Sequence, residues 1–87
     1  MDLIYPAPGA RIFIPRDFDG KPGSSIFELA HRDNHAEVFW HLDGVFIGST
    51  MGTHRLALTP SEGEHLLTIV DQSGQSLQEH FTVISKL

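Results

Sequence analysis

Histidine is the residue type in this sequence with the most obvious capacity for chemistry. Six of the 87 residues are histidines: His31, His35, His41, His54, His65 and His80. Neutral imidazole is the commonest metal ligand, but a site needs three or four ligands that converge. His31 and His35 flank a turn, and His41 and His80, if on neighbouring strands, supply two ligands at most. We therefore predict no metal site and no cofactor, and interpret the histidines as solvated or singly hydrogen-bonded groups.

The serines and carboxylates do not form a recognisable catalytic set. A nucleophilic serine needs a base and an oxyanion hole, and no nucleophile-elbow pattern surrounds any serine here. The aspartates occupy positions where turns favour Asp. Gly48–Gly52 has a glycine at each end, but it precedes a strand and not a helix, so we expect a crossover loop and no phosphate cradle. The sequence thus predicts no catalytic residue, and the domain is not expected to be an enzyme.

The composition argues against two further classes of function, nucleic-acid binding and membrane spanning. The formal net charge is −5 and the six basic residues form no run, which argues against nucleic-acid binding through phosphates. Cysteine is absent, and no stretch approaches the roughly 20 apolar residues that span a bilayer. We expect residues 1–87 to form a single domain that does not itself cross a membrane.

The elements that must position these residues are strands. Turn signals recur about every 8–12 residues, and the runs between them are rich in β-branched and aromatic residues. No segment holds a helical apolar period. We predict strands near Leu3–Tyr5, Arg11–Ile14, Ser25–His31, Glu37–Leu42, Val45–Ile47, His54–Leu58, His65–Asp71 and Leu77–Ile84.

Alternation within two of these strands predicts the core. Val38, Trp40 and Leu42 share one face of their strand, and Leu67 and Ile69 share a face with His65. The remaining predicted core residues are Leu56, Leu58, Phe81 and Val83. A buried Trp on a middle strand between hairpins indicates an all-β, immunoglobulin- or fibronectin-III-like antiparallel sandwich of about seven strands.

Several turn residues are predicted to have structural roles. Asp43-Gly44 is a two-residue hairpin signal, and Ser73-Gly74 should join the last two strands. The His65 ring, which follows the Gly63 turn, is expected to close the edge of the core and to bond the backbone. The predicted structural residues are Trp40, Asp43, Gly44, Gly63, His65, Asp71 and Gly74.

The opposite face of the same strands is unusually apolar. It carries Phe39, His41, Leu66, Thr68, Val70, His80, Thr82 and Ile84. Outer faces of sandwiches are normally polar. If the strands are neighbours, Phe39, Leu66, Val70 and Ile84 form an exposed patch. Such a patch is either a contact surface or an ordinary set of exposed apolar residues. As the candidate interaction face we select Phe39, His41, Leu66, Thr68, Val70 and Ile84.

Several segments carry a resemblance to a known family. They are Ile4–Gly9 (IYPAPG), Trp40–Gly48 (WHLDGVFIG), Pro60–Leu67 (PSEGEHLL), Asp71–Gly74 (DQSG) and Phe81–Val83 (FTV). This pattern resembles the C-terminal domain of penicillin-binding protein 1C, a bifunctional cell-wall synthase. The segment Asp17–Gly23 departs from the pattern and is interpreted as a displayed loop. The resemblance covers nearly the whole chain.

The resemblance implies an accessory module of a periplasmic enzyme anchored in the inner membrane. The parent would polymerise glycan and crosslink peptides in other domains, and the Ser-x-x-Lys motif of penicillin-binding enzymes is absent here. The module would dock onto the parent's catalytic domains or onto another periplasmic protein. Two alternatives remain: a module that binds peptidoglycan or another carbohydrate, for which Tyr5, Phe18 and Phe39 are the available aromatics, and a structural spacer.

Overall fold

The computed structural model describes residues 1–15 and 23–84, and all regular structure among them is β. Phe18 and most of the Asp17–Gly23 segment lie outside the described residues. The strands are β1 (Asp2–Tyr5), β2 (Arg11–Phe13), β3 (Ser25–Ala30), β4 (Glu37–Leu42), β5 (Val45–Met51), β6 (His54–Leu58), β7 (Gly63–Asp71) and β8 (Ser76–Ile84). Each lies where a strand was predicted, so the all-β class is confirmed.

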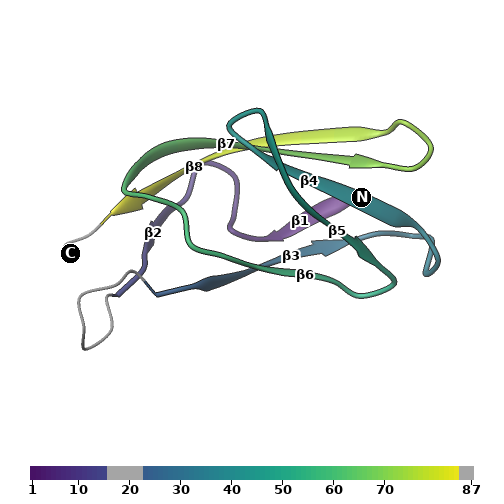
Figure 1. The fold of residues 1–87 in the computed structure, drawn as a ribbon, viewed down its shortest axis with the longest axis horizontal. Coiled ribbons are helices and arrows are strands. Elements are labelled where there is room, and N and C mark those ends of the chain that lie inside the picture. Colours follow the sequence, from purple (N-terminus) through teal and green to yellow (C-terminus); the bar gives the residue numbers. More distant parts are fainter. Residues whose placement is uncertain (16–22, 85–87) are drawn as a thin grey trace.

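The strands form two packed layers (Figure 1). One sheet has the order β1-β3-β6 and the other has the order β2-β8-β7-β4-β5. All pairs are antiparallel except β2 with β8, which run parallel. Within the described residues the fold is therefore a sandwich of eight strands, with a parallel pair at one edge of the larger sheet.

The core lies between the layers and centres on Trp40. Trp40 and Phe27 of the facing sheet are both fully buried, and Phe27 packs edge-on against Phe81 with ring centroids 5.2 Å apart. Period-two alternation explains this arrangement, because it turns Val38 and Trp40 inward on β4 and leaves Phe39 outward. Most predicted core residues are buried, whereas Leu42 and Leu56 are only partly buried. The contribution of β3 to the core was not predicted.

Both predicted hairpins form. Asp43 and Gly44 adopt φ values of 53° and 82°, which is the left-handed pair that a type I′ turn requires. The turn closes on Leu42, which pairs with Val45. The connection between β7 and β8 runs from Gln72 to Gln75 and also contains a glycine with positive φ, Gly74.

Two expectations about the arrangement are wrong. Residues 48–51 are not a crossover loop but the second half of β5, paired with β4 from Trp40 to Glu37. A bulge at Trp40/His41 absorbs one extra β5 residue, so the strand continues past Gly48 instead of ending there. His41 and His80 are not on neighbouring strands, because β7 lies between β4 and β8.

Truncation of the buried indole tests the core. We expect Trp40→Ala to lower the free energy of unfolding by roughly 3–5 kcal/mol, since a large buried aromatic leaves a cavity that this small core cannot close. Chemical denaturation measures the change. Phe46→Ala, at a side chain that is 56% exposed, is the control and should cost about 1 kcal/mol or less. Equal costs for the two variants would contradict the central role of Trp40.

Candidate functional site

The outer face of the five-stranded sheet brings together most of the predicted interaction residues. Phe39 lies opposite Val70, and His41 lies opposite Thr68. Leu66 follows on the same face of β7. All five side chains are half-buried by their neighbours and not fully exposed. These five residues form one continuous surface, which we call the β4/β7 face.

Ile84 is not part of the β4/β7 face. Val70 lies opposite Ser76 at the start of β8, whereas Ile84 is the last residue of that strand. Leu66, the nearest member of the face, lies opposite His80, which at about 3.3 Å per residue is roughly 13 Å along β8 from Ile84. Ile84 instead pairs with Phe13 of β2, which is exposed. His80 and Thr82 lie between these two apolar areas.

Two residues of the neighbouring strand extend the β4/β7 face. Phe46 lies opposite His41, and the two rings meet edge-on with centroids 5.6 Å apart. Met51 lies opposite Glu37 and is 63% exposed. Phe46 could have been found from the sequence, because a two-residue turn at Asp43-Gly44 fixes its pairing with His41. Met51 could not, because its position depends on the bulge.

His65 joins two loops at one end of the sandwich. Its Nδ1 lies 2.6 Å from a carboxylate oxygen of Asp43, and its Nε2 lies 2.7 Å from the carbonyl oxygen of Ser61. Both partners can only accept, so both ring nitrogens must donate, and this arrangement is complete only in the imidazolium form. Burial disfavours that charged form, but the hydrogen bonds to Ser61 and Asp43 outweigh it and raise the pKa of His65.

The same cluster holds the β4–β5 turn in place. The second carboxylate oxygen of Asp43 accepts a hydrogen bond of 2.8 Å from the Leu66 amide. This bond and the one from His65 lower the pKa of Asp43. The His65 ring also stacks on Phe81, with centroids 5.3 Å apart and an angle of 25° between the planes. The two residues thus tie a hairpin to the edge of the core, and they present no free group for chemistry.

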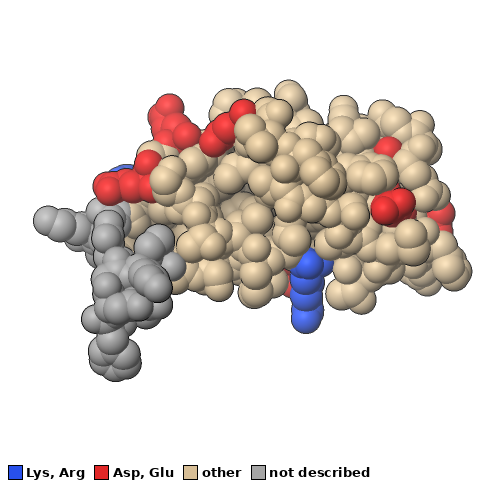
Figure 2. Space-filling model, in the orientation of Figure 1, with Lys and Arg blue, Asp and Glu red and all other residues tan. Residues whose placement is uncertain are grey.

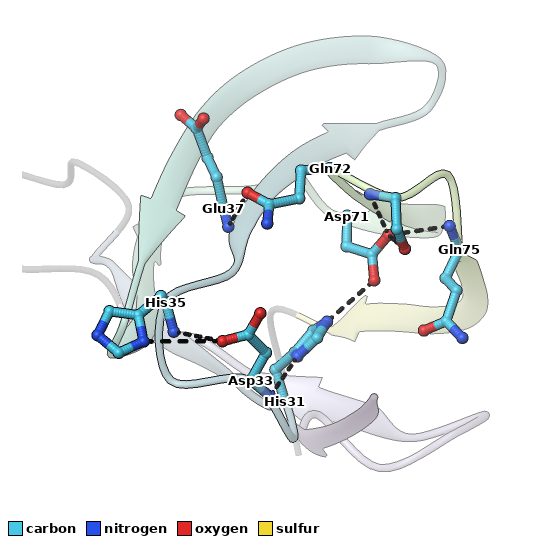
Figure 3. Close-up of polar contacts among 8 residues, drawn as sticks. His31, Asp33, His35, Glu37, Asp71, Gln72 and Gln75 are labelled. Carbon is cyan, nitrogen blue, oxygen red and sulfur yellow. Dashed lines mark hydrogen bonds and ion pairs between the residues drawn. The ribbon is translucent and has the colours of Figure 1, made fainter.

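Asp71 organises the opposite end of the sheet (Figure 3). One carboxylate oxygen accepts bonds from the Ser73 amide, the Ser73 hydroxyl and the Gln75 amide, at 2.7 to 3.0 Å. The other oxygen lies 2.9 Å from His31 Nε2. Because Nδ1 of His31 accepts from the Asp33 amide, Nε2 carries the proton and donates it to Asp71. The hydrogen bonds from His31 and Ser73 hold the pKa of Asp71 far below its usual value.

A third polar chain begins at the buried indole. Trp40 Nε1 donates to Thr50 Oγ1 over 2.9 Å, and that oxygen lies 2.7 Å from His54 Nδ1. His54 is buried, and its Nε2 has no hydrogen-bond partner in the described part of the chain. Burial, together with the nearby His31 ring, lowers the pKa of His54. His54 is a neutral core residue, and it gives the Thr50 hydroxyl a second hydrogen-bond partner beside Trp40.

The histidines are thus distributed over separate clusters. Among residues 1–15 and 23–84, no group of three or more His, Cys, Asp or Glu side chains could hold a metal ion. The same residues include no helix long and apolar enough to cross a membrane. The feature of the described residues that bears on function is a surface, the β4/β7 face with Phe46 and Met51 beside it.

The fold and this surface define the class as a fibronectin-III-like sandwich module. Among solved structures, the chain is similar to the fibronectin(III)-like modules of CbhA from Clostridium thermocellum, with a TM-score of 0.64. The two are 15% identical over 98% of this chain and 94% of that one, which shows the fold alone. No curated protein matches the sequence.

The family follows from a direct match. The model of the Penicillin-Binding Protein C-terminus Family matches residues 1–83, so the chain belongs to that family. The resemblance deduced from the Trp40–Gly48 and Asp71–Gly74 motifs is confirmed at this level.

The His65–Asp43 pair predicts a pH-dependent contribution to stability. A raised folded-state pKa stabilises the protein fully below the unfolded value of 6.5, and the contribution is lost as the pH rises through the folded pKa. We expect Asp43→Asn to cost more free energy of unfolding near pH 5.5 than near pH 8.5. Denaturation of both proteins at each pH measures this, and the titration of His54 cancels in the difference. A cost that does not depend on pH would contradict the ion pair.

Asp71 predicts sensitivity to acid. Its lowered pKa contributes stability above the unfolded value of 3.8, and that contribution is lost as the pH falls. Asp71→Asn should therefore lower the denaturation midpoint at pH 7 and flatten its decline below about pH 4. Asp2→Asn, at an exposed carboxylate on β1, is the matched control. If both variants decline in parallel with the wild type, the carboxylate of Asp71 is not the acid-sensitive group.

Proposed function

We propose that this domain is a non-catalytic accessory module of a penicillin-binding protein that acts in peptidoglycan synthesis in the periplasm. Family membership supports the parent's identity. The polar clusters support the absence of catalysis, because His65, Asp43, Asp71 and His31 are each engaged in bonds that fix loops. The domain's role is to dock, either onto the parent's catalytic domains or onto a protein partner.

The β4/β7 face carries this proposal. Phe39, Val70 and Leu66 lie on the solvent side of β4 and β7, two neighbouring interior strands of the larger sheet, where a sandwich normally places polar residues. Phe46 and Met51 extend the apolar area at the adjoining edge. Apolar surface of this kind, bordered by polar side chains such as Glu37 and Gln78, is typical of contact sites.

A carbohydrate-binding function has less support. Sugars stack on exposed aromatic rings, and the only tryptophan is fully buried. Tyr5 lies on the three-stranded sheet and packs edge-on against Phe27, whereas Phe39 lies on the other sheet. Tyr5 and Phe39 therefore do not form one stacking platform. We favour a protein surface over a glycan as the ligand.

Charge substitution on the face tests this function. Phe39→Asp and Val70→Asp should each weaken binding of the domain to the purified remainder of the parent enzyme by about tenfold or more, because an aspartate must then be desolvated in an apolar contact. Calorimetry measures the affinity, and circular dichroism checks that the variants fold. Ala57→Asp makes the same change at an exposed position on the other sheet and should bind normally.

The result also separates the alternatives. Wild-type affinity in both folded variants would refute docking through this face. Retention of the domain on purified peptidoglycan, unaffected by either variant, would instead support a glycan-binding module. If the domain binds neither the parent enzyme nor peptidoglycan, a structural spacer is the remaining interpretation.

A further inference from the structure

Among the described residues, the edge strands differ in how well they are protected against pairing with a strand of another chain. Edge strands expose unpaired peptide groups, and proteins usually guard them with charges, proline or short length. β1 contains Asp2, β6 contains Arg55, and β2 is three residues long with Arg11 at its start. β5 is the longest of these edges at seven residues, and its sequence VFIGSTM has no charge and no proline. Among these protective features β5 has only its bulge. The bulge does not affect Ser49 to Met51, which pair regularly with β4.

The peptide groups of β5 that point outward can be assigned from the neighbouring ladder. Asp43 N donates to Leu66 O, and Glu37 O accepts from Gln72 N, so the odd-numbered residues of β4 direct their peptide groups toward β7. In an antiparallel pair, the peptide groups of the residues opposite them then point away from β4. These residues are Phe46, Ser49 and Met51. Within the described residues, no backbone hydrogen bond outside the β4 ladder reaches β5.

Two of these residues, Phe46 and Met51, have side chains on the same side of the sheet as the proposed docking surface. Phe46 and Met51 are paired with His41 and Glu37, whose side chains lie on the outer face beside Phe39. A strand added to β5 would therefore continue the β4/β7 face sideways. Its alternate side chains would cover Phe46 and Met51, which are otherwise the most exposed apolar groups of this face.

Charge indicates what kind of strand would bind. Glu37 lies opposite Met51 at the far end of β5, whereas the carboxylate of Asp43, in the turn just before β5, is already paired with His65. Figure 2 shows acidic side chains toward both ends of the molecule and few basic ones in that view. With a net charge of −5, a second copy of the chain would be repelled, whereas a segment with basic ends would be attracted.

We infer that β5 accepts an extended, apolar segment of a partner protein with lysine or arginine at the end that lies beside Glu37, which adds a sixth strand to the larger sheet. The affinity comes from main-chain hydrogen bonds to Phe46, Ser49 and Met51, and the preference for basic residues comes from the Glu37 carboxylate and the net negative charge of the chain. This inference rests on the proposed docking function, which it extends from the sheet face to the sheet edge.

A blocked peptide Lys-Val-Thr-Val-Thr-Val-Lys tests the edge. In nuclear magnetic resonance titrations of the whole chain, it should slow hydrogen exchange of the Ser49 and Met51 amides by about tenfold, because these donors become bonded. The same peptide with glutamate at both ends should bind at least about fivefold more weakly. Exchange of these amides that does not change with saturating peptide, or equal affinity for both peptides, would overturn the inference.

A proline substitution tests the hydrogen bonding directly. Ser49→Pro removes an outward donor but no bond to β4, so it should reduce peptide affinity by about tenfold, while Ser49→Ala, which keeps the amide, binds as the wild type does. If Ser49→Pro does not fold, the exchange measurement on the wild type still decides the matter. A peptide-free domain that forms dimers with a protected β5 would show that a second copy is the occupant, and would refute a basic partner.

The two proposals fail in different ways. Val70 lies two strands from the edge, so Val70→Asp should leave peptide binding intact. If the peptide does not bind while docking to the parent remains sensitive to Val70→Asp, the edge inference fails and the docking face stands. If the parent does not dock but the peptide protects β5, the docking function fails and a strand-binding edge remains.

Discussion

The burial of one indole ring is the interaction on which this domain depends. Trp40 is fully enclosed between the sheets, and its single polar atom is bonded to Thr50. The ring is the largest buried side chain in a core cluster that draws on both sheets, with Phe27 on one side and Phe81 on the other, and a domain this small has few further residues with which to fill that volume. The hydroxyl of Thr50 is available only because β5 continues past Gly48. The bulge in β5 and the packing of the core are therefore linked.

The polar clusters solve a different problem, which is to fix the ends of the sheets. Asp43 with His65 secures the β4–β5 turn against the β6–β7 connection, and Asp71 with His31 secures the β7–β8 turn against the end of β3. The Asp71 carboxylate takes the Ser73 and Gln75 amides of its own turn, and the Asp43 carboxylate takes the Leu66 amide of β7, so each satisfies backbone donors at a sheet end. This explains why histidines are frequent in a domain without a metal cluster among its described residues: several of them act as connectors between loops.

Much of the fold could be predicted because it is encoded locally. Alternation around Trp40, glycines at turns and the spacing of apolar runs located every strand to within a few residues. The order of strands could not be deduced in the same way, because β7 inserts between β4 and β8 through connections whose crossing leaves no local pattern. The same limit applies to the site. Phe39 and Val70 share a face by alternation, but the separation of Ile84 and the addition of Met51 depend on register and on a bulge.

The two faces of β4 and β7 connect stability with the proposed docking function. One face of each strand is committed to the core, and the hydrogen bonds between the strands hold the other face at fixed spacing. A docking surface built on such a sheet loses little conformational entropy on binding, because its side chains are already half-buried by one another. The edge strand β5 is held on only one side. It can therefore accept a new partner without disturbing the core, provided that the incoming strand bonds the outward peptide groups that β4 leaves free.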